Sequence, residues 1–120
     1  MVFGYRTHGR GRRPSGMRVH DDGRVELGDG DAWEPLTSLD ADGLARLDDA
    51  VRASGILELP ERTPAPPNIK GGDTCELWSD LDGGVHAFVD GWADGNPAAE
   101  PSRALVLTLS GLVSAAQAAG

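Results

Sequence analysis

Residues 38–60 carry the clearest pattern of apolar and polar positions in the chain. Apolar residues recur there at the 3.6-residue period of a helix with one buried face; they are Leu44, Leu47 and Val51. Asp40 has the position of an N-cap, and Gly55 that of a left-handed residue that ends a helix. The pattern predicts a helix over residues 41–54, followed by a short strand that stops at Pro60.

A second helix is predicted near the end of the chain, from Pro101 to about Ala118. Its apolar face is broad and has the same period; it consists of Leu105, Val106, Leu109, Leu112, Val113 and Ala116. Proline suits the first turn of a helix, whereas Gly111 in its interior costs about 1 kcal/mol relative to alanine. We therefore expect packing against the rest of the protein to hold this helix in place.

Before the first helix, apolar and polar residues alternate as they do in a half-buried β-strand. Two cross-strand pairs bring the apolar residues to one face: Met17–Leu27 and Val19–Val25. This pairing leaves residues 21–23, Asp-Asp-Gly, as a three-residue turn whose glycine can take the left-handed conformation. The pattern predicts a β-hairpin.

A second hairpin is predicted over residues 75–90, with Asp-Gly-Gly as its turn. The register that keeps one face apolar or small has the pairs Leu77–Val89, Ser79–Ala87 and Leu81–Val85. On the other face it places Trp78 opposite Phe88, an exposed aromatic pair that needs a cover. It also places Asp80 opposite His86, and we expect this ion pair to be structural rather than catalytic.

Residues 2–5 fit one further strand. Strands joined by hairpins form antiparallel sheets, and amphipathic helices cover one face of such sheets. We therefore expect an α+β fold: an antiparallel sheet of four to five strands built from two hairpins, with two helices packed on one face. Residues 1–120 are expected to form a single domain, with residues 1–16 as a mobile basic loop and irregular loops over 61–74 and 91–100.

Charge is distributed unevenly along the 120 residues. The formal net charge is −8, but residues 1–20 hold five arginines and no acidic residue, so the remaining residues sum to −13. A basic segment can dock an anionic partner, whereas the acidic remainder repels an extended polyanion such as nucleic acid. A protein is therefore favoured over nucleic acid as the partner.

The number of cysteines and the hydropathy of the chain indicate the cellular compartment that we expect. The single cysteine excludes an internal disulfide. No apolar run reaches the ~18 residues of a membrane-spanning helix, and no apolar signal core follows Met1. We expect a cytoplasmic protein with no membrane partner.

Residues that usually carry catalysis or bind metals do not fall into a recognised pattern. In the predicted register Cys75 lies roughly 16 Å along the strand from His86, too far for a nucleophile and its base. Calcium loops that would begin at residues 40, 80 or 90 lack either a required oxygen ligand or the glycine at position 6, and the three histidines lack zinc-ligand spacing. We expect no catalytic residue, no metal and no cofactor.

Four parts of the chain have counterparts in a known family: Leu39, Leu44 and Leu47; Ile56-Leu57-Glu58-Leu59-Pro60; the hairpin from Leu77 to Val89; and the leucines from Leu105 to Leu112. Over residues 36–118 this order resembles the emfourins, small bacterial proteins that inhibit thermolysin-like metalloproteases, and also several uncharacterised bacterial domains of the same size. The resemblance implies a bacterial protease inhibitor. Residues 7–16 are longer and more basic than the family's glycine-rich inhibitory region, so no inhibitory residue is transferred.

We therefore expect a small non-catalytic interaction protein, with protease inhibition as the activity that the resemblance implies. The candidate partner-binding residues are arginines and aromatic residues of the kind enriched at interfaces: Arg6, Arg10, Arg12, Arg13, Trp78, Phe88 and Trp92. Two alternatives stay open. One is an anion- or nucleic-acid-binding accessory domain that uses the N-terminal arginines, and the other is a small enzyme with an unrecognised site.

Overall fold

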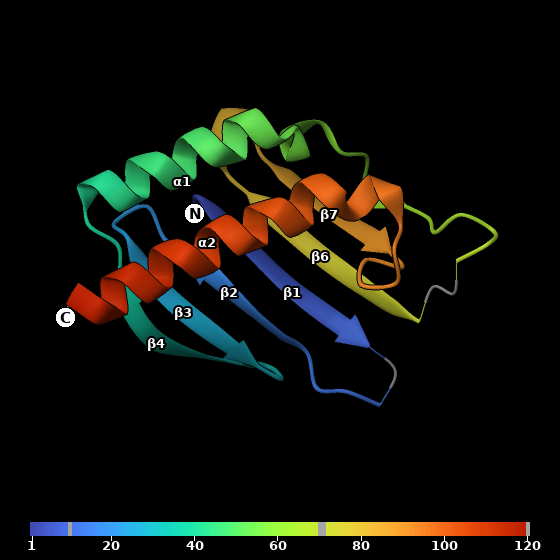
Figure 1. The fold of residues 1–120 in the computed structure, drawn as a ribbon, viewed down its shortest axis with the longest axis horizontal. Coiled ribbons are helices and arrows are strands. Elements are labelled where there is room, and N and C mark those ends of the chain that lie inside the picture. Colours follow the sequence, from blue (N-terminus) through green and yellow to red (C-terminus); the bar gives the residue numbers. More distant parts are fainter. Residues whose placement is uncertain (10, 70–71, 120) are drawn as a thin grey trace.

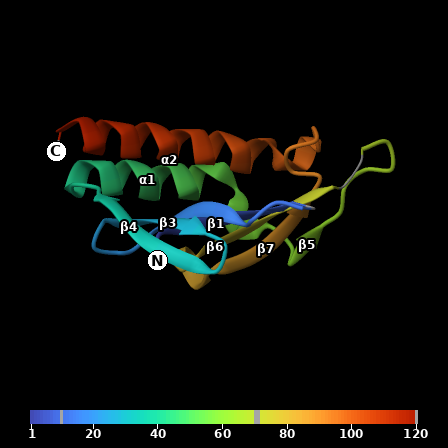
Figure 2. The ribbon, with the colours of Figure 1, turned by 90° about the horizontal axis from the view of Figure 1, so that it is seen from below.

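The structure is a computed structural model that describes residues 1–9, 11–69 and 72–119. Helices α1 and α2 lie side by side on one face of a seven-stranded sheet (Figure 1), and the other face is left without a helix in the described part of the chain (Figure 2). The helices are α1 Ala41–Ser54 and α2 Glu100–Ala119, with 3₁₀ turns at Ile56–Glu58, Leu81–Gly83 and Pro97–Ala99. The strands are β1 Phe3–Gly9, β2 Ser15–Val19, β3 Arg24–Asp29, β4 Ala32–Ser38, β5 Arg62–Thr63, β6 Asp73–Ser79 and β7 Val85–Asp90.

The strands follow the order β4-β3-β2-β1-β6-β7-β5 across the sheet. Neighbouring strands are antiparallel except β5 and β7, which run parallel. The predicted α+β class, with two helices on one face, is therefore confirmed. The prediction of four to five purely antiparallel strands was wrong, because the sheet is mixed and has two further strands, β4 and β5, at its edges.

Strand β4 was not predicted from the sequence, and it contains a proline, which is unfavourable in most strands. Proline has no N–H to donate and is tolerated mainly on edge strands or at bulges. Both conditions hold here, because β4 lies at the edge of the sheet and the pairing with β3 shifts between Val25 and Glu26, where Pro35 is reached. The edge position and the bulge together allow Pro35 in a strand.

Residues 3–9 form strand β1 in the middle of the sheet, not the basic loop expected over residues 1–16. The strand pairs with β2 on one side and β6 on the other. Its side chains alternate, so Phe3 is buried under the helices whereas Arg6 faces the opposite side. The predicted strand at residues 2–5 is thus confirmed and continues to Gly9.

The first hairpin has the predicted register, with Met17 opposite Leu27 and Val19 opposite Val25. Its turn contains Gly23 with a φ of 93°, in the left-handed region that glycine adopts without strain. Alternation of apolar residues and a glycine turn thus sufficed to determine this pairing.

The register predicted for the second hairpin was wrong by two residues. Leu77 faces Ala87 and Ser79 faces Val85, so the connection is longer than three residues. Contacts with the start of the chain hold this arrangement: the Ser79 hydroxyl donates to the carbonyl of Val2 at 2.6 Å, and the Asp80 N–H donates to the carbonyl of Met1 at 2.9 Å. A slip of two residues keeps each side chain on its predicted face.

The segment before Pro60 was also predicted wrongly, because Ile56–Glu58 is a 3₁₀ turn and not a short strand. The Leu59 N–H donates to the carbonyl of Ile56 at 3.1 Å, which closes this turn. The strand in this region comes later, as the two-residue β5, and the Phe88 N–H donates to the carbonyl of Glu61 just before it.

The core lies between the sheet and the two helices. It combines inward-facing residues of the central strands with the predicted helix stripes; fully buried members include Phe3, Val19, Val25, Leu47, Val51, Leu77, Val89 and Leu109. Burying each such side chain stabilises the fold by roughly 1.5–3 kcal/mol. Neither helix in the described residues is long and apolar enough to cross a lipid bilayer.

Both predicted ends of α1 are confirmed. Asp40 Oδ1 accepts a hydrogen bond from the Gly43 N–H at 2.7 Å, and Gly55 has a φ of 83°. The glycine is needed for its conformation rather than for space, because a Cβ atom added there would meet nothing within 4 Å.

We predict that Gly55→Val lowers the free energy of unfolding by about 1–2 kcal/mol, because a β-branched residue is strained in the left-handed region. Gly111→Ala is the matched control, since Gly111 lies inside α2 with open space around it and alanine should stabilise the helix by about 1 kcal/mol. Urea denaturation measures both variants. An unchanged stability for Gly55→Val would contradict the proposed helix end.

Candidate functional site

The face of the sheet that lies away from the helices, here called the open face, collects most of the charged and aromatic strand residues. The strand register arranges them in two rows across the sheet. One row contains Trp33, Gly28, Gly16, Arg6, Glu76 and Phe88. The other contains Glu26, Arg18, Gly4, Trp78 and His86.

Four rings form a continuous series across this face, which we call the aromatic band: Trp33, Trp78, His86 and Phe88. Trp33 and Trp78 meet edge to face with their centroids 6.0 Å apart, and Trp78 meets His86 in the same way at 6.5 Å. His86 and Phe88 are tilted at 5.1 Å. The aromatic band thus links β4, at one edge of the sheet, to β6 and β7.

Two glycines make room for the indole rings against the sheet. A Cβ atom at Gly4 would lie 2.6 Å from the ring of Trp78, and one at Gly28 would lie 2.9 Å from the ring of Trp33. Real Cβ contacts are longer than this, so each ring lies where only a glycine leaves space. The glycines in these strands therefore shape the open face.

Guanidinium groups lie against both ends of the aromatic band. Arg18 is 4.3 Å and Arg6 5.7 Å from the centroid of Trp33, and Arg62 is 5.9 Å from that of Phe88. These distances are within the range of cation–π attraction, worth about 0.5–1 kcal/mol at exposed sites. The arginines are thereby held in place on the open face.

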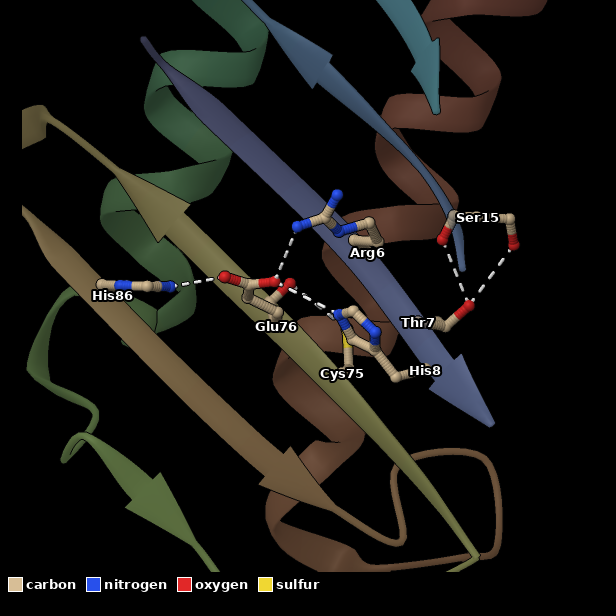
Figure 3. A network of polar contacts seen from close by, with 7 residues as sticks. All are labelled: Arg6, Thr7, His8, Ser15, Cys75, Glu76 and His86. Carbon is tan, nitrogen blue, oxygen red and sulfur yellow. Dashed lines mark hydrogen bonds and ion pairs between the residues drawn. The ribbon is translucent and has the colours of Figure 1, made fainter. Parts of the chain in front are cut away.

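Glu76 lies at the centre of the open face, between two histidines and an arginine (Figure 3). Its Oε1 is 3.2 Å from His8 Nε2 and accepts from Arg6 Nη2 at 3.3 Å, while its Oε2 is 2.6 Å from His86 Nε2. Burial opposes ionisation of this carboxyl, whose side chain is 13% exposed, but the hydrogen bonds outweigh burial and lower its pKa. Glu76 is therefore held as a carboxylate.

A second carboxylate on the open face has a similar environment. Glu26 accepts from Arg18 Nε at 2.9 Å and also contacts His20. Hydrogen bonds with His20 and Arg18 lower the pKa of Glu26. All three histidines of the chain thus lie beside a glutamate of this face: His8 and His86 beside Glu76, and His20 beside Glu26.

A hollow of about 390 Å³ opens on this face between Trp33, Trp78 and His86, with Arg6, Arg18 and Glu76 also in its lining. Another hollow, of about 430 Å³, lies between the start of α1 and the end of α2. The acidic group Asp40 in that second hollow already caps α1. Because the hollow on the open face combines aromatic rings with ionised groups, we take it as the candidate site.

Among the predicted partner-binding residues that the structure describes, three lie together on the open face: Arg6, Trp78 and Phe88. Trp92 lies on the helix side, where its Nε1 donates to Ser102 Oγ at 2.8 Å and its ring packs against the core.

Two further arginines of the prediction, Arg12 and Arg13, do not lie on the strands of the open face. Arg12 and Arg13 lie in the β1–β2 connection, and Arg13 pairs with Asp29 at 3.1 Å. Arg10 lies outside the described residues. The predicted residues that the structure describes therefore do not all lie on one surface.

The predicted pair of Asp80 with His86 was wrong. His86 binds Glu76, whereas the Asp80 carboxylate pairs with the amino group of Met1 at 2.8 Å. Trp78 faces His86 across the strands rather than Phe88, because the hairpin register is shifted by two residues. His86 therefore lies between the two apolar rings that were expected to meet.

Several residues of the open face were not among the predicted site residues: His8, Arg18, His20, Glu26, Trp33 and Glu76. One signal was available, since residues 3–9 alternate between inward residues such as Phe3 and outward residues such as His8. That Trp33 and Trp78 meet was not accessible, because they come from strands that are far apart in the chain and in the sheet order.

Two kinds of reactive group can be checked against this arrangement. Cys75 is fully buried toward the core, and burial raises the pKa of its thiol well above the ordinary value. Within residues 1–9, 11–69 and 72–119, no three side chains of the metal-binding types converge on one point, and His8 and His86 approach Glu76 from opposite sides (Figure 3). The open face presents ionised side chains, hydrogen-bonding groups and aromatic rings.

Comparison of the chain with known protein families and with curated proteins finds no match.

We predict that Glu76→Gln lowers the free energy of unfolding at pH 7 by about 1–3 kcal/mol, because the two histidines and Arg6 lose an ionised acceptor. The pKa of Glu76 is lowered by folding from its ordinary 4.5, so its contribution is complete above that pH and is lost as pH falls through the folded pKa.

Urea denaturation of both proteins at a series of pH values tests this prediction. The difference in stability between wild type and Glu76→Gln should shrink from about pH 5 to about pH 3. A difference that stays constant over this range would show that ionisation of Glu76 does not stabilise the fold.

Proposed function

We propose that this protein is a non-catalytic interaction protein that binds a protein partner through the open face of its sheet. The observation that carries the proposal is the aromatic band, bordered by Arg6, Arg18 and Arg62, on a sheet whose other face is covered by two helices. A binding surface of this kind needs exposed rings on a rigid support.

The residue types of the open face are those that dominate binding energy in protein interfaces. Tryptophan and arginine are over-represented among residues whose truncation costs about 2 kcal/mol or more of binding energy. Trp33, Trp78 and Phe88 are each only partly buried by the fold, so a partner can remove further apolar area from water.

Rigidity supports the same proposal. The indole rings lie against Gly4 and Gly28, and Glu76 on β6 holds side chains from the two neighbouring strands, Arg6 and His8 from β1 and His86 from β7. Side chains that are already fixed lose little conformational entropy on binding. A partner would therefore meet a preformed surface.

Protease inhibition is the specific form of this function that the resemblance to emfourins implies. A thermolysin-like metalloprotease is the corresponding partner class. The open face offers a surface against which such a partner could dock.

The alternative of nucleic-acid binding through the N-terminal arginines has less support. Arg6 is bound to Glu76 and Arg13 to Asp29, and they lie at separate places on the sheet and in the β1–β2 connection. A continuous positive track of the kind that follows a phosphate backbone is not formed by Arg6, Arg12 and Arg13 in the described chain.

The open-face proposal predicts that Phe88→Thr weakens partner binding by at least about tenfold, because a ring of the aromatic band is lost while strand propensity is kept. Leu107→Gln is the matched control: it removes an apolar side chain that is 73% exposed on α2, on the other side of the molecule. Proteins retained by the immobilised wild-type chain are identified, and their affinities are measured by calorimetry.

Loss of binding in Leu107→Gln with retention in Phe88→Thr would move the interface to α2 and contradict the proposal. Equal binding by all three proteins would also contradict it.

Inhibition is tested directly by adding the wild-type chain and the same two variants to a thermolysin-like metalloprotease. We expect inhibition by wild type and Leu107→Gln, and weaker inhibition by Phe88→Thr. If the wild-type chain in excess leaves the protease fully active, protease inhibition is wrong.

A further inference from the structure

We propose that the open face binds an acidic segment of its protein partner, and that protonation of the three histidines strengthens this binding. The inference rests on the proposed function and adds the chemistry of the partner and its control by pH. It is carried by the position of every histidine of the chain on one face, each beside a glutamate.

Each of the two glutamates that contact a histidine is also paired with one arginine. Arg6 lies 3.3 Å from Glu76, and Arg18 lies 2.9 Å from Glu26. The charges cancel when the histidines are neutral. Because imidazole is the side chain that ordinarily changes charge between pH 5 and pH 8, acidification leaves each pair with excess positive charge.

The other charged groups around the histidines are acidic in sum. Arg62, Arg24 and the Met1 amino group face carboxylates in the ion pairs Arg62–Asp90, Arg24–Asp22, Met1–Asp80 and Met1–Asp21. Glu61 lies beside His86 and Phe88. These groups sum to −2 with neutral histidines, and protonation of all three histidines brings the face to +1.

A change of sign alters which partner the face attracts. At mildly alkaline pH the face and the whole chain, with its net charge of −8, both repel acidic segments. At mildly acidic pH the face becomes positive while the rest of the chain stays negative. Long-range attraction of an acidic segment is then directed to this face.

Two of the histidines are open to a partner. The side chain of His86 is 59% exposed and that of His8 is 40% exposed, whereas Glu76 between them is 13% exposed. A partner carboxylate can therefore approach either imidazole from solvent while Glu76 holds the other side of the ring. The aromatic band beside them offers apolar contact for the same segment.

A short acidic segment of protein fits this surface better than nucleic acid does. The positive region is confined to one face, and α1 on the other side carries three aspartates against two arginines, which leaves that helix acidic by one charge. An extended polyanion would run from the face onto this acidic surface and be repelled. The hollow of about 390 Å³ accommodates a few side chains.

The test measures binding of a fluorescein-labelled peptide of alternating glutamate and alanine by fluorescence anisotropy. The wild-type chain is compared at about pH 6 and about pH 8 at low, constant ionic strength, because salt screens such attraction. We expect the affinity to be about tenfold higher at the lower pH. A peptide with lysine in place of glutamate should show no such increase.

The double variant His8→Gln with His86→Gln removes two of the titrating groups while glutamine can still donate to Glu76. It should lose most of the pH dependence, so its affinities at about pH 6 and about pH 8 should lie close together. His20→Gln, measured separately, should lose a smaller part, so the test does not depend on the double variant being stable.

Equal affinity of the wild type at both pH values, or the same pH dependence in the double variant, would overturn the proposal. A single-stranded oligonucleotide that binds more tightly than the acidic peptide, with the same pH dependence, would replace it with nucleic-acid binding.

If a captured protein partner binds through Phe88 with no pH dependence, the proposed function stands and this inference fails. If the peptide behaves as expected but Phe88→Thr leaves partner binding unchanged, the proposed function fails instead.

Discussion

Strand β1 pairs with β2 on one side and β6 on the other, and so joins the two hairpins into one sheet. Its inward residues, such as Phe3, enter the core, whereas Arg6 and His8 reach Glu76 on the open face. The carbonyl groups of the two residues just before it accept hydrogen bonds from the Ser79 hydroxyl and the Asp80 N–H at the end of β6, which sets the register of the second hairpin. Core, open face and hairpin register therefore all depend on this one strand.

The open face combines features that usually oppose each other in a sheet. Glycine weakens a strand, and a large exposed ring costs free energy in water. Here Gly4 and Gly28 let the rings of Trp78 and Trp33 lie close to the sheet, and the rings also contact each other and the arginines. Part of the apolar area of the two indole rings is buried in this way, and the rest stays exposed.

Charged and titratable side chains are distributed differently on the two sides of the molecule. Acidic residues on α1 and in the loops give the chain its net charge, while the three histidines lie on the open face. A weakly charged surface on an otherwise acidic protein can change sign through a few protons. This division links the proposed docking surface to its proposed control by pH, since both depend on the same side chains.

Local sequence determined the elements whose signals lie within a few residues: both helices, the cap at Asp40, the helix end at Gly55 and the first hairpin. It also determined which side chains of β6 and β7 face the core, because a strand alternates with period two. The tertiary structure alone decided the edge strands, the register of the second hairpin and the contacts of Glu76 with Arg6, His8 and His86. Each of these joins residues far apart in the chain, such as His8 with Glu76, and their pairing is set by which strands become neighbours in the sheet.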